Sequence, residues 1–344
     1  MNSKKTFFIN LILVIVWLGL AVLFNLYAIS FLKAKVWVAV ICSLAGVAIN
    51  YFIALFVHEL GHLIFAKKNG FVVNYVNFGL FAIDFTKQSK KVKFFTFFGE
   101  NAGESVFVPN REITKQKLQS TAFGGLLFSL IFVVLSVVFV LFITSPVAFC
   151  LVGVAIVPAT YLLVVNCLAF DKTSDGYLIF SNDDYADVLV EAMHQERQIA
   201  KGIIPSCPSI LENSVQPLAR IYYYKHLIIR EKFKRANELL IDLSADILQF
   251  TDQEYELILP EIIYSECING NLSEQNKNLA ENFFVAANND VATVRAHREY
   301  RKLKGEENWA QTLDKSYQRL LRSSTKFVKE YEKRLKQFSE QNNR

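Results

Sequence analysis

The sequence has 344 residues, of which 52% are hydrophobic and 20% are charged. This composition is typical of a protein that is partly embedded in a membrane and partly soluble, and the length leaves room for about two domains. The net charge of +5 does not indicate nucleic-acid binding, because the lysines and arginines are scattered between apolar runs and along helices. The cysteines show no regular spacing, which argues against a disulfide framework.

Four apolar runs are long enough to cross a bilayer, which takes about 20 residues in a helix. We predict spans over Phe7–Leu26, Val36–Ala66, Ser120–Thr144 and Val147–Phe170. The first run is too long for the core of a signal peptide, and no small-residue cleavage site follows it. We therefore expect this run to be retained as a span.

Lysines beside the spans predict the topology, since positively charged loops tend to stay in the cytosol. Lys4 and Lys5 place the N-terminus inside, and the lysine-rich stretch 67–93 places the second connection inside as well. Lys33 and Lys35 in the first, outer loop count against this orientation. With four spans the C-terminus also returns to the cytosol, in a multi-pass protein of the cell membrane.

The connection 70–119 between the second and third spans is predicted to form a β-hairpin. The runs FVVNYVNFGLFAIDF (71–85) and KVKFFTFFGE (91–100) are rich in β-branched and aromatic residues, and TKQSKK (86–91) between them is a polar turn. The segment ENAGESVFVPN (100–110) is a candidate for a further short strand or a loop. We expect this small sheet on the cytosolic side of the membrane.

After residue 180 the sequence becomes polar and takes on helical periodicity. We predict a membrane-embedded domain over residues 1–180 and a cytosolic, all-helical domain over residues 181–344. The stretch from Ile221 to Leu243 is similar to a tetratricopeptide hairpin, but the period is not sustained, so a plain helical bundle is an equal alternative. Such a domain is expected to bind a protein partner or to associate with itself. The predicted helices are Asp184–Lys201, Val215–Lys232, Phe233–Gln249, Asp252–Asn269, Ser273–Asn288, Asp290–Lys304, Glu307–Ser323 and Thr325–Glu340.

The motif HELGH, residues 58–62, lies inside the second apolar run. His58 and His62 are four residues apart, so on a helix they share one face and can direct imidazole nitrogens at one metal ion such as Zn²⁺. Glu59 lies beside that face, where it can take a proton from an attacking water and pass it to a leaving amine. The alternative is a polar helix end at the membrane surface. The apolar context disfavours it, because each ionisable residue there costs insertion free energy.

A catalytic zinc site requires a third protein ligand. The second span places His58 and His62 near the cytosolic end of its helix, so the third ligand should come from the inner end of another span. Asp171 and Asp175 lie just past the fourth span. Both remain candidates, and we favour Asp175 because a glycine follows it and permits a tight turn. The three other histidines fall in the predicted soluble domain.

The HELGH motif in an apolar helix, followed later by an asparagine and then Asp-Gly after another span, resembles the site-2 protease family of intramembrane zinc metalloproteases. The resemblance covers about residues 36–180. It implies that Asp175 is the third zinc ligand, that Asn166 binds substrate, and that a strand edge after HELGH holds the substrate extended. The pair Gly124-Gly125 partly matches the family's Gly-Pro motif, and we assign both glycines to helix packing.

Three positions depart from the family pattern. Ala169 stands where the motif of Asn166 has proline, Ser174 replaces the leucine before Asp175, and Gly125 replaces the proline that opens the third span. None of these changes removes a ligand. They indicate a divergent member.

We therefore expect a zinc-dependent intramembrane metalloendopeptidase that cleaves a transmembrane or signal-derived peptide near the cytosolic membrane face. The main alternative is a non-catalytic membrane scaffold whose cytosolic helices bind protein partners. A metal transporter is a further alternative, but the spans offer few polar residues to line a path. From the resemblance, the membrane is expected to be a bacterial plasma membrane.

Overall fold

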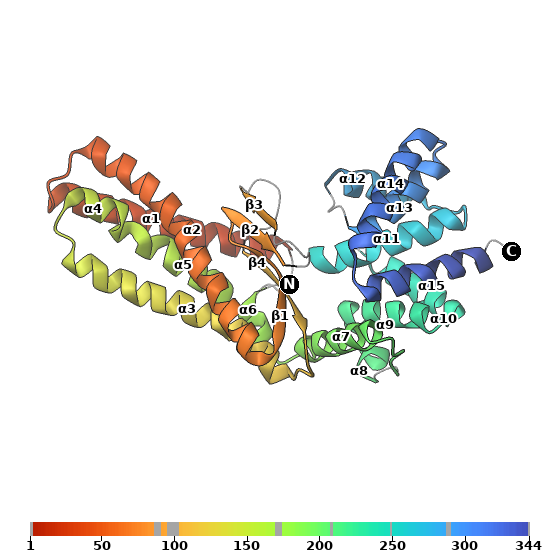
Figure 1. The fold of residues 1–344 in the computed structure, drawn as a ribbon. Coiled ribbons are helices and arrows are strands. Elements are labelled where there is room, and N and C mark those ends of the chain that lie inside the picture. Colours follow the sequence, from red (N-terminus) through yellow and green to blue (C-terminus); the bar gives the residue numbers. More distant parts are fainter. Residues whose placement is uncertain are drawn as a thin grey trace. The chain divides into compact units, whose positions relative to one another are not determined.

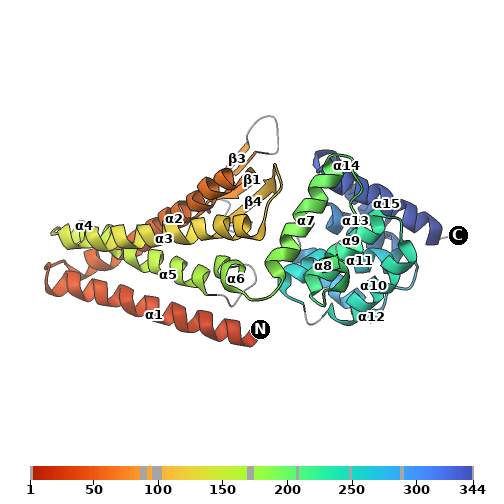
Figure 2. The same cartoon turned by 90° about the horizontal axis from the view of Figure 1, so that it is seen from below.

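The computed structural model describes residues 3–85, 91–94, 103–168, 174–206, 209–247, 250–286 and 290–342. The protein is mainly helical, with one small antiparallel sheet. It divides into two compact units, Met1–Ala186 and Asp187–Arg344, referred to below as the N-terminal and C-terminal units. Figures 1 and 2 show the course of the chain in two views.

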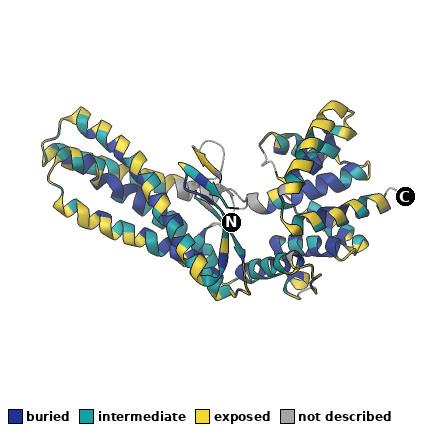
Figure 3. Ribbon diagram, in the orientation of Figure 1, coloured by how far each residue is buried: buried dark blue, intermediate teal, exposed yellow. Residues whose placement is uncertain are grey.

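The N-terminal unit contains four stretches that are long and apolar enough to cross a membrane, as the sequence predicts. Three are single helices and the fourth is interrupted. Their outward surfaces carry exposed apolar side chains, and those of Leu141 and Phe142 are 77% exposed. Figure 3 shows such exposed positions along α1 and α3. The helices are α1 (Ser3–Ser30), α2 (Val36–Asn69), α3 (Lys115–Phe142), α4 (Pro146–Leu151) and α5 (Ile156–Cys167).

The fourth span is not one continuous helix, because a 3₁₀ turn (Gly153–Ala155) separates α4 from α5. Pro158 explains the break: it has no N–H for the carbonyl of Val154, and its ring crowds that turn. The Ala155 N–H bonds Val152, which leaves the Leu151 carbonyl without its usual helical partner. The Asn50 amide of α2 donates to that carbonyl at 2.8 Å. A polar side chain inside one span thus supplies the hydrogen bond that a backbone carbonyl loses at the break in another span.

Helices α2 and α3 approach each other closely at a pair of glycines. A Cβ added to Gly61 of α2 would lie 2.2 Å from the Gly124 carbonyl oxygen, and a Cβ on Gly124 would lie 2.6 Å from the Gly61 oxygen. Only residues without a side chain allow two backbones this near. The packing role predicted for Gly124 is confirmed, and Gly61 is its partner.

The connection between α2 and α3 forms a four-stranded antiparallel sheet in the order β3-β2-β1-β4. The predicted pairing across the turn is present between β2 and β3, but the run 71–85, predicted on one side of the turn, is itself a hairpin of β1 and β2. The segment 100–110 supplies the strand β4. Most of the predicted turn 86–91 lies outside the described residues. In Figures 1 and 2 the sheet lies at the end of α2 that leads into it. The strands are β1 (Phe71–Asn77), β2 (Phe81–Asp84), β3 (Lys91–Phe94) and β4 (Glu104–Pro109).

The sheet is tied directly to the end of α2. Gly70 caps the helix with φ of +90°, a left-handed conformation that favours glycine, and β1 begins at the next residue. Strand β1 pairs with both β2 and β4, so β3 and β4 are the two edges within the described residues. Within β4, Ser105 pairs with Val76 of β1.

A short helix, α6 (Asp175–Phe180), follows the fourth span and was not predicted from the sequence. Ser174 is its N-cap, and the side-chain oxygen accepts from the Tyr177 N–H at 3.2 Å. The serine that departs from the family pattern therefore has a structural role, because it starts the helix on which Asp175 is the first residue.

The C-terminal unit is a packed set of helices, and the eight predicted from periodicity are confirmed with ends within a few residues. The short helix α8 was missed because five residues show no period. Thr251 and Glu254 form a capping box at the start of α11. Figure 3 shows buried positions concentrated on the inner faces of these helices. The helices are α7 (Tyr185–Ala200), α8 (Ser209–Asn213), α9 (Pro217–Ile229), α10 (Phe233–Ala245), α11 (Asp252–Ile268), α12 (Glu274–Ala286), α13 (Val291–Leu303), α14 (Glu307–Ser323) and α15 (Lys326–Asn342).

Candidate metal centre

His58, Glu59 and His62 lie together on the later part of α2, and all three are buried. One potential ligand atom from each residue lies within 4.8 Å of the others. The His58 and His62 Nε2 atoms are 3.1 Å apart. The helical spacing therefore brings the two imidazoles to one point, as the motif predicts.

Helix α3 fixes the orientation of both imidazole rings. The His58 Nδ1 lies 2.9 Å from the hydroxyl of Ser129, and the His62 Nδ1 lies 3.0 Å from the carbonyl oxygen of Thr121. A carbonyl only accepts, so the His62 Nδ1 carries a proton, and in the neutral ring the lone pair is therefore on Nε2. Histidines that bind a metal are commonly held in this way through their second nitrogen.

Asp175 completes the cluster from α6. Its Oδ2 lies 3.2 Å from the Nε2 of His58 and 3.2 Å from the Nε2 of His62. Ligand atoms of a tetrahedral zinc ion with bonds of about 2.0–2.1 Å lie about 3.3 Å from one another. The triangle formed by these three atoms has the size of one face of such a tetrahedron.

The Asp175 carboxyl is ionised in this setting. Burial by itself raises its pKa, but the positive charge on His62 and hydrogen bonds from both imidazoles outweigh burial and lower the pKa to about 2. The Oδ2 is buried, and among the described residues only these two rings lie within hydrogen-bond distance of it. An ionised oxygen beside two imidazole nitrogens is the donor set that suits zinc.

The position of α6 is set by its neighbours. The Gln119 amide of α3 donates to the carbonyls of Leu178 and Ile179, at 3.2 and 3.3 Å. A Cβ added to Gly176 would lie 2.1 Å from the Cys167 carbonyl oxygen at the end of α5. Asp175-Gly176 is therefore a pair in which one residue faces the histidines and the other lets the helix approach α5.

Gly125 is part of this centre, a role that its sequence context does not predict. A Cβ at this position would lie 2.4 Å from the His62 Nε2 and 2.8 Å from the His58 Cε1. The residue that replaces the family proline therefore leaves room for the imidazoles, in addition to the packing role predicted for it. The sequence alone gives no signal for this, because the contact depends on the rotation of α3 against α2.

The Glu59 carboxylate is held by the sheet. The Ser105 hydroxyl of β4 donates a hydrogen bond to the Glu59 Oε2. Ser105 is not among the predicted site residues, because no motif around it in the sequence indicates a functional role. The general-base candidate and the ligand candidates are thus supported by different elements of the fold.

The remaining predicted residues are placed as follows. Asn166 donates from its amide to the Leu162 carbonyl of its own helix at 3.0 Å, so its substrate-binding role stays a prediction. Asp171, the alternative ligand, lies outside the described residues. His194, His226 and His297 lie in the C-terminal unit, as the sequence predicts.

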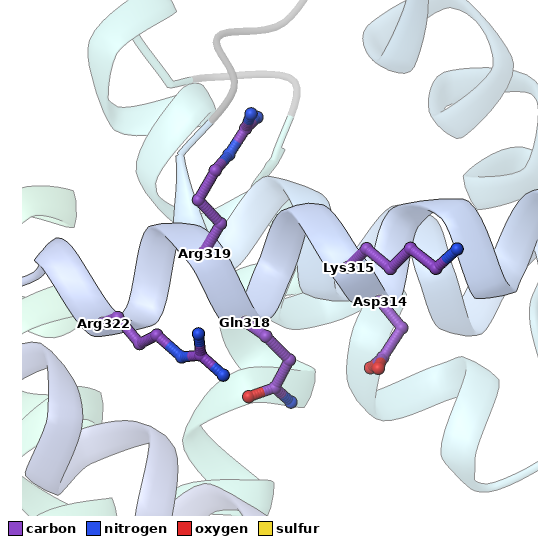
Figure 4. A pocket seen from close by; sticks show the side chains of 5 residues that line it. All are labelled: Asp314, Lys315, Gln318, Arg319 and Arg322. Carbon is purple, nitrogen blue, oxygen red and sulfur yellow. The ribbon is translucent and has the colours of Figure 1, made fainter.

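The C-terminal unit has a surface hollow on α14, lined by Asp314, Lys315, Gln318, Arg319 and Arg322. In Figure 4 Arg319 extends from one side of the helix, whereas Gln318 and Arg322 extend from the other. Asp314 is paired with Arg298 at 2.6 Å. Side chains that point away from one another in this way do not converge on a ligand. They are typical of a solvated helix face.

Two imidazoles and a carboxylate converge among apolar helices, beside a buried glutamate, and this arrangement could hold a metal ion. A family model, Peptidase family M50, matches residues 46–341, which is most of the chain. The chain therefore belongs to peptidase family M50, the family of intramembrane metalloproteases that includes the site-2 proteases. No curated protein and no solved structure gives a significant match.

Proposed function

We propose that this protein is a zinc-dependent intramembrane endopeptidase that hydrolyses a transmembrane or signal-derived peptide near the cytosolic membrane face. The observation that carries the proposal is the convergence of the His58, His62 and Asp175 ligand atoms within 3.1–3.2 Å, with Glu59 on the same helix. When bound, zinc activates a water molecule and polarises the peptide carbonyl.

The residues of the chain divide the remaining work. Glu59 accepts a proton from the attacking water and returns it to the leaving amine. His58, His62 and Asp175 hold the ion, and α3 keeps the two rings in place. The buried surroundings exclude bulk water, which strengthens the charge interactions at the reacting bond.

A membrane substrate must be unwound before it can be cleaved, because a helix hides its peptide bonds behind its own hydrogen bonds. An edge strand offers unpaired N–H and C=O groups to the released segment. The edge strand that contacts Glu59 is β4, through Ser105, so we place the receiving edge at residues 104–109. Asn166 is assigned to the same task of holding substrate, on the resemblance alone.

The cytosolic location follows from charge. Lys67 and Lys68 lie in the last turn of α2, on the side where the helix leads into the sheet. Positively charged flanks stay in the cytosol, which puts the sheet and the nearby centre at the inner face. In this topology the C-terminal unit is cytosolic, where its helices bind a protein partner or a second copy.

The test uses the purified protein in lipid vesicles with a membrane-spanning peptide library. Glu59→Gln should lower cleavage by about 10²- to 10⁴-fold, because it removes proton transfer. Zinc content should stay unchanged, because Glu59 is not a ligand. Glu112→Gln, on the exposed loop before α3, is the matched control and should cleave as the unaltered protein does.

Cleavage that survives Glu59→Gln would overturn the assignment of the base. A zinc-loaded protein that cleaves no membrane peptide, in vesicles or in a membrane-proteome comparison with the Glu59→Gln strain, would instead favour the scaffold function.

A further inference from the structure

The support of the Glu59 carboxylate comes from the sheet, whereas the support of the ligand histidines comes from α3. Glu59 is 1% exposed, so its contacts decide where its oxygens point. The Ser105 hydroxyl donates to the Oε2. An ionised carboxylate only accepts, so this donor fixes one oxygen and leaves the other for a proton.

The strand that carries Ser105 is anchored at this end. Gly103 donates its N–H to the Asn77 carbonyl of β1 at 3.0 Å, and Ser105 pairs with Val76. Asn77 is fully buried, and its side-chain oxygen accepts from the Gly79 N–H at 2.8 Å. These bonds place the Ser105 hydroxyl on a rigid element, which is what a positioning contact requires.

Gly103 lets this end of β4 come close to α2. Its φ is +78°, in the left-handed region that favours glycine. A Cβ there would lie 2.8 Å from the Leu55 Cδ1 and 3.4 Å from the Glu59 Oε1. The chain therefore passes directly over the carboxylate, with one oxygen bonded to Ser105 and the other facing the backbone turn.

We propose that Ser105 is a positioning residue for the general base, so that β4 orients Glu59 for proton transfer. The inference rests on the proposed function of Glu59. A carboxylate side chain turns freely about its last bond, and general-base catalysis requires one oxygen at hydrogen-bond distance from the proton it takes. The hydroxyl of Ser105 removes that freedom.

Strand β4 is also the edge that would receive an extended substrate. The element that holds the peptide and the element that holds the base are then one and the same. Strand β4 would then fix the positions of both the scissile bond and the Glu59 carboxylate, which keeps them aligned with each other.

The experiment compares Ser105→Ala, Ser105→Thr and the control Ser136→Ala in the zinc-loaded, full-length protein. Ser136 is a buried serine of α3 whose hydroxyl donates to its own helix at 2.8 Å. Ser105→Ala should lower kcat by about 10- to 100-fold with little change in KM. Ser105→Thr keeps the hydroxyl and should restore most of the rate. Zinc content should be the same in all three variants.

A second readout does not depend on turnover. The infrared difference between a protein and its Glu59→Gln version isolates the carboxylate stretch of Glu59. This band should shift when the measurement is repeated in the Ser105→Ala background of the metal-free protein, because a hydrogen bond to the carboxylate is lost. In the Ser136→Ala background it should not move.

The outcomes distinguish the proposed protease function from the positioning role of Ser105. Activity that is absent, or insensitive to Glu59→Gln, counts against the proposed function, and the infrared band still decides whether Ser105 binds Glu59. If cleavage depends on Glu59 but Ser105→Ala cleaves at the unaltered rate, or if the band stays in place, Ser105 does not position the base.

Discussion

The protein buries two clusters of ionisable side chains, one in each unit, and they are built on opposite principles. In the N-terminal unit two imidazole nitrogens and the Asp175 oxygen point at a common centre. In the C-terminal unit Arg295 lies between Glu261 and Glu332, bonding each through its guanidinium. The first cluster brings together atoms that can donate lone pairs to a cation, and the second brings together side chains of opposite charge.

The C-terminal cluster pairs its charges internally, although the Arg295 Nε has no hydrogen-bond partner among the described residues. The Arg295 Nη2 donates to Glu261 at 2.6 Å, and the Tyr317 hydroxyl donates to Glu332 at 2.9 Å. The guanidinium lies 4.6 Å from the ring centre of Tyr264, a favourable cation–π distance. The two carboxylates raise the pKa of Arg295 against the effect of burial. Such a cluster needs no ligand, and its role is to stabilise the packing of the C-terminal unit.

The N-terminal cluster is complete only with a cation or a proton at its centre. When His62 is neutral, the proton on its Nδ1 faces the Thr121 carbonyl and the Nε2 lone pair lies 3.2 Å from the Asp175 Oδ2. Lone pairs this close repel one another unless a cation or a proton lies between them. Burial alone therefore does not mark a functional site, whereas converging acceptor atoms form an arrangement that can bind a cation.

The largest expected effect tests the structural side of this comparison. Arg295→Met leaves two buried carboxylates without their partner and should destabilise the C-terminal unit by about 3–5 kcal/mol. Hydrogen exchange of the detergent-purified protein should show lost protection in α11, α13 and α15, with zinc content unchanged. Arg235→Met, in the more exposed pair with Glu212, should cost about 1 kcal/mol or less.

A sharper version replaces the whole cluster with apolar residues, as Glu261→Leu, Arg295→Met and Glu332→Leu together. This change should recover much of the stability lost by Arg295→Met alone, because no charge stays buried. Loss of zinc in the Arg295→Met protein would contradict the separation drawn between the two clusters.

A smaller effect comes from pH. Burial, with the positive charges of Arg230 and Lys232, lowers the pKa of His226 from its ordinary 6.5 to about 4, although Glu212 opposes the shift. Below pH 6.5 the unfolded chain takes up a proton that the folded chain refuses until about pH 4. The C-terminal unit should therefore keep its full stability above pH 6.5 and lose part of it between pH 6.5 and 4.

Thermal unfolding across this range measures the effect, and His226→Gln should flatten the profile. His297 has a pKa lowered to about 4 by burial and by Arg301, so part of the slope should persist in that variant. A profile that rises as the pH falls would contradict the assignment of His226 and the half-buried His297 as neutral.

Much of the fold could be predicted from the sequence, because its periods are strong. Apolar runs of 20 or more residues identify spans, and amphipathic repeats set the ends of helices such as Glu307–Ser323 within a residue or two. Pro158 is a visible signal for a break in the fourth apolar run, but the bond from Asn50 to the Leu151 carbonyl could not be predicted, since it depends on how two helices pack.

The candidate site could be predicted in part. His58 and His62 share a helix face by spacing, and Asp175 was favoured because a glycine follows it. The contact of Ser105 with Glu59 could not be predicted. Which side chains of a strand contact a helix depends on the strand register and on the path of the strand across the helix. The same holds for Gly125, whose contact with the imidazoles follows from the packing of α3.

The central claim is that His58, His62 and Asp175 hold one divalent metal ion. The direct measurement is the zinc content of the purified protein compared with Asp175→Asn and the matched variant Asp171→Asn. We expect about one zinc per chain in the unaltered protein and in Asp171→Asn, and a clear loss in Asp175→Asn. Zinc that stays in Asp175→Asn and leaves in Asp171→Asn, or a protein that binds none at all, would contradict the account.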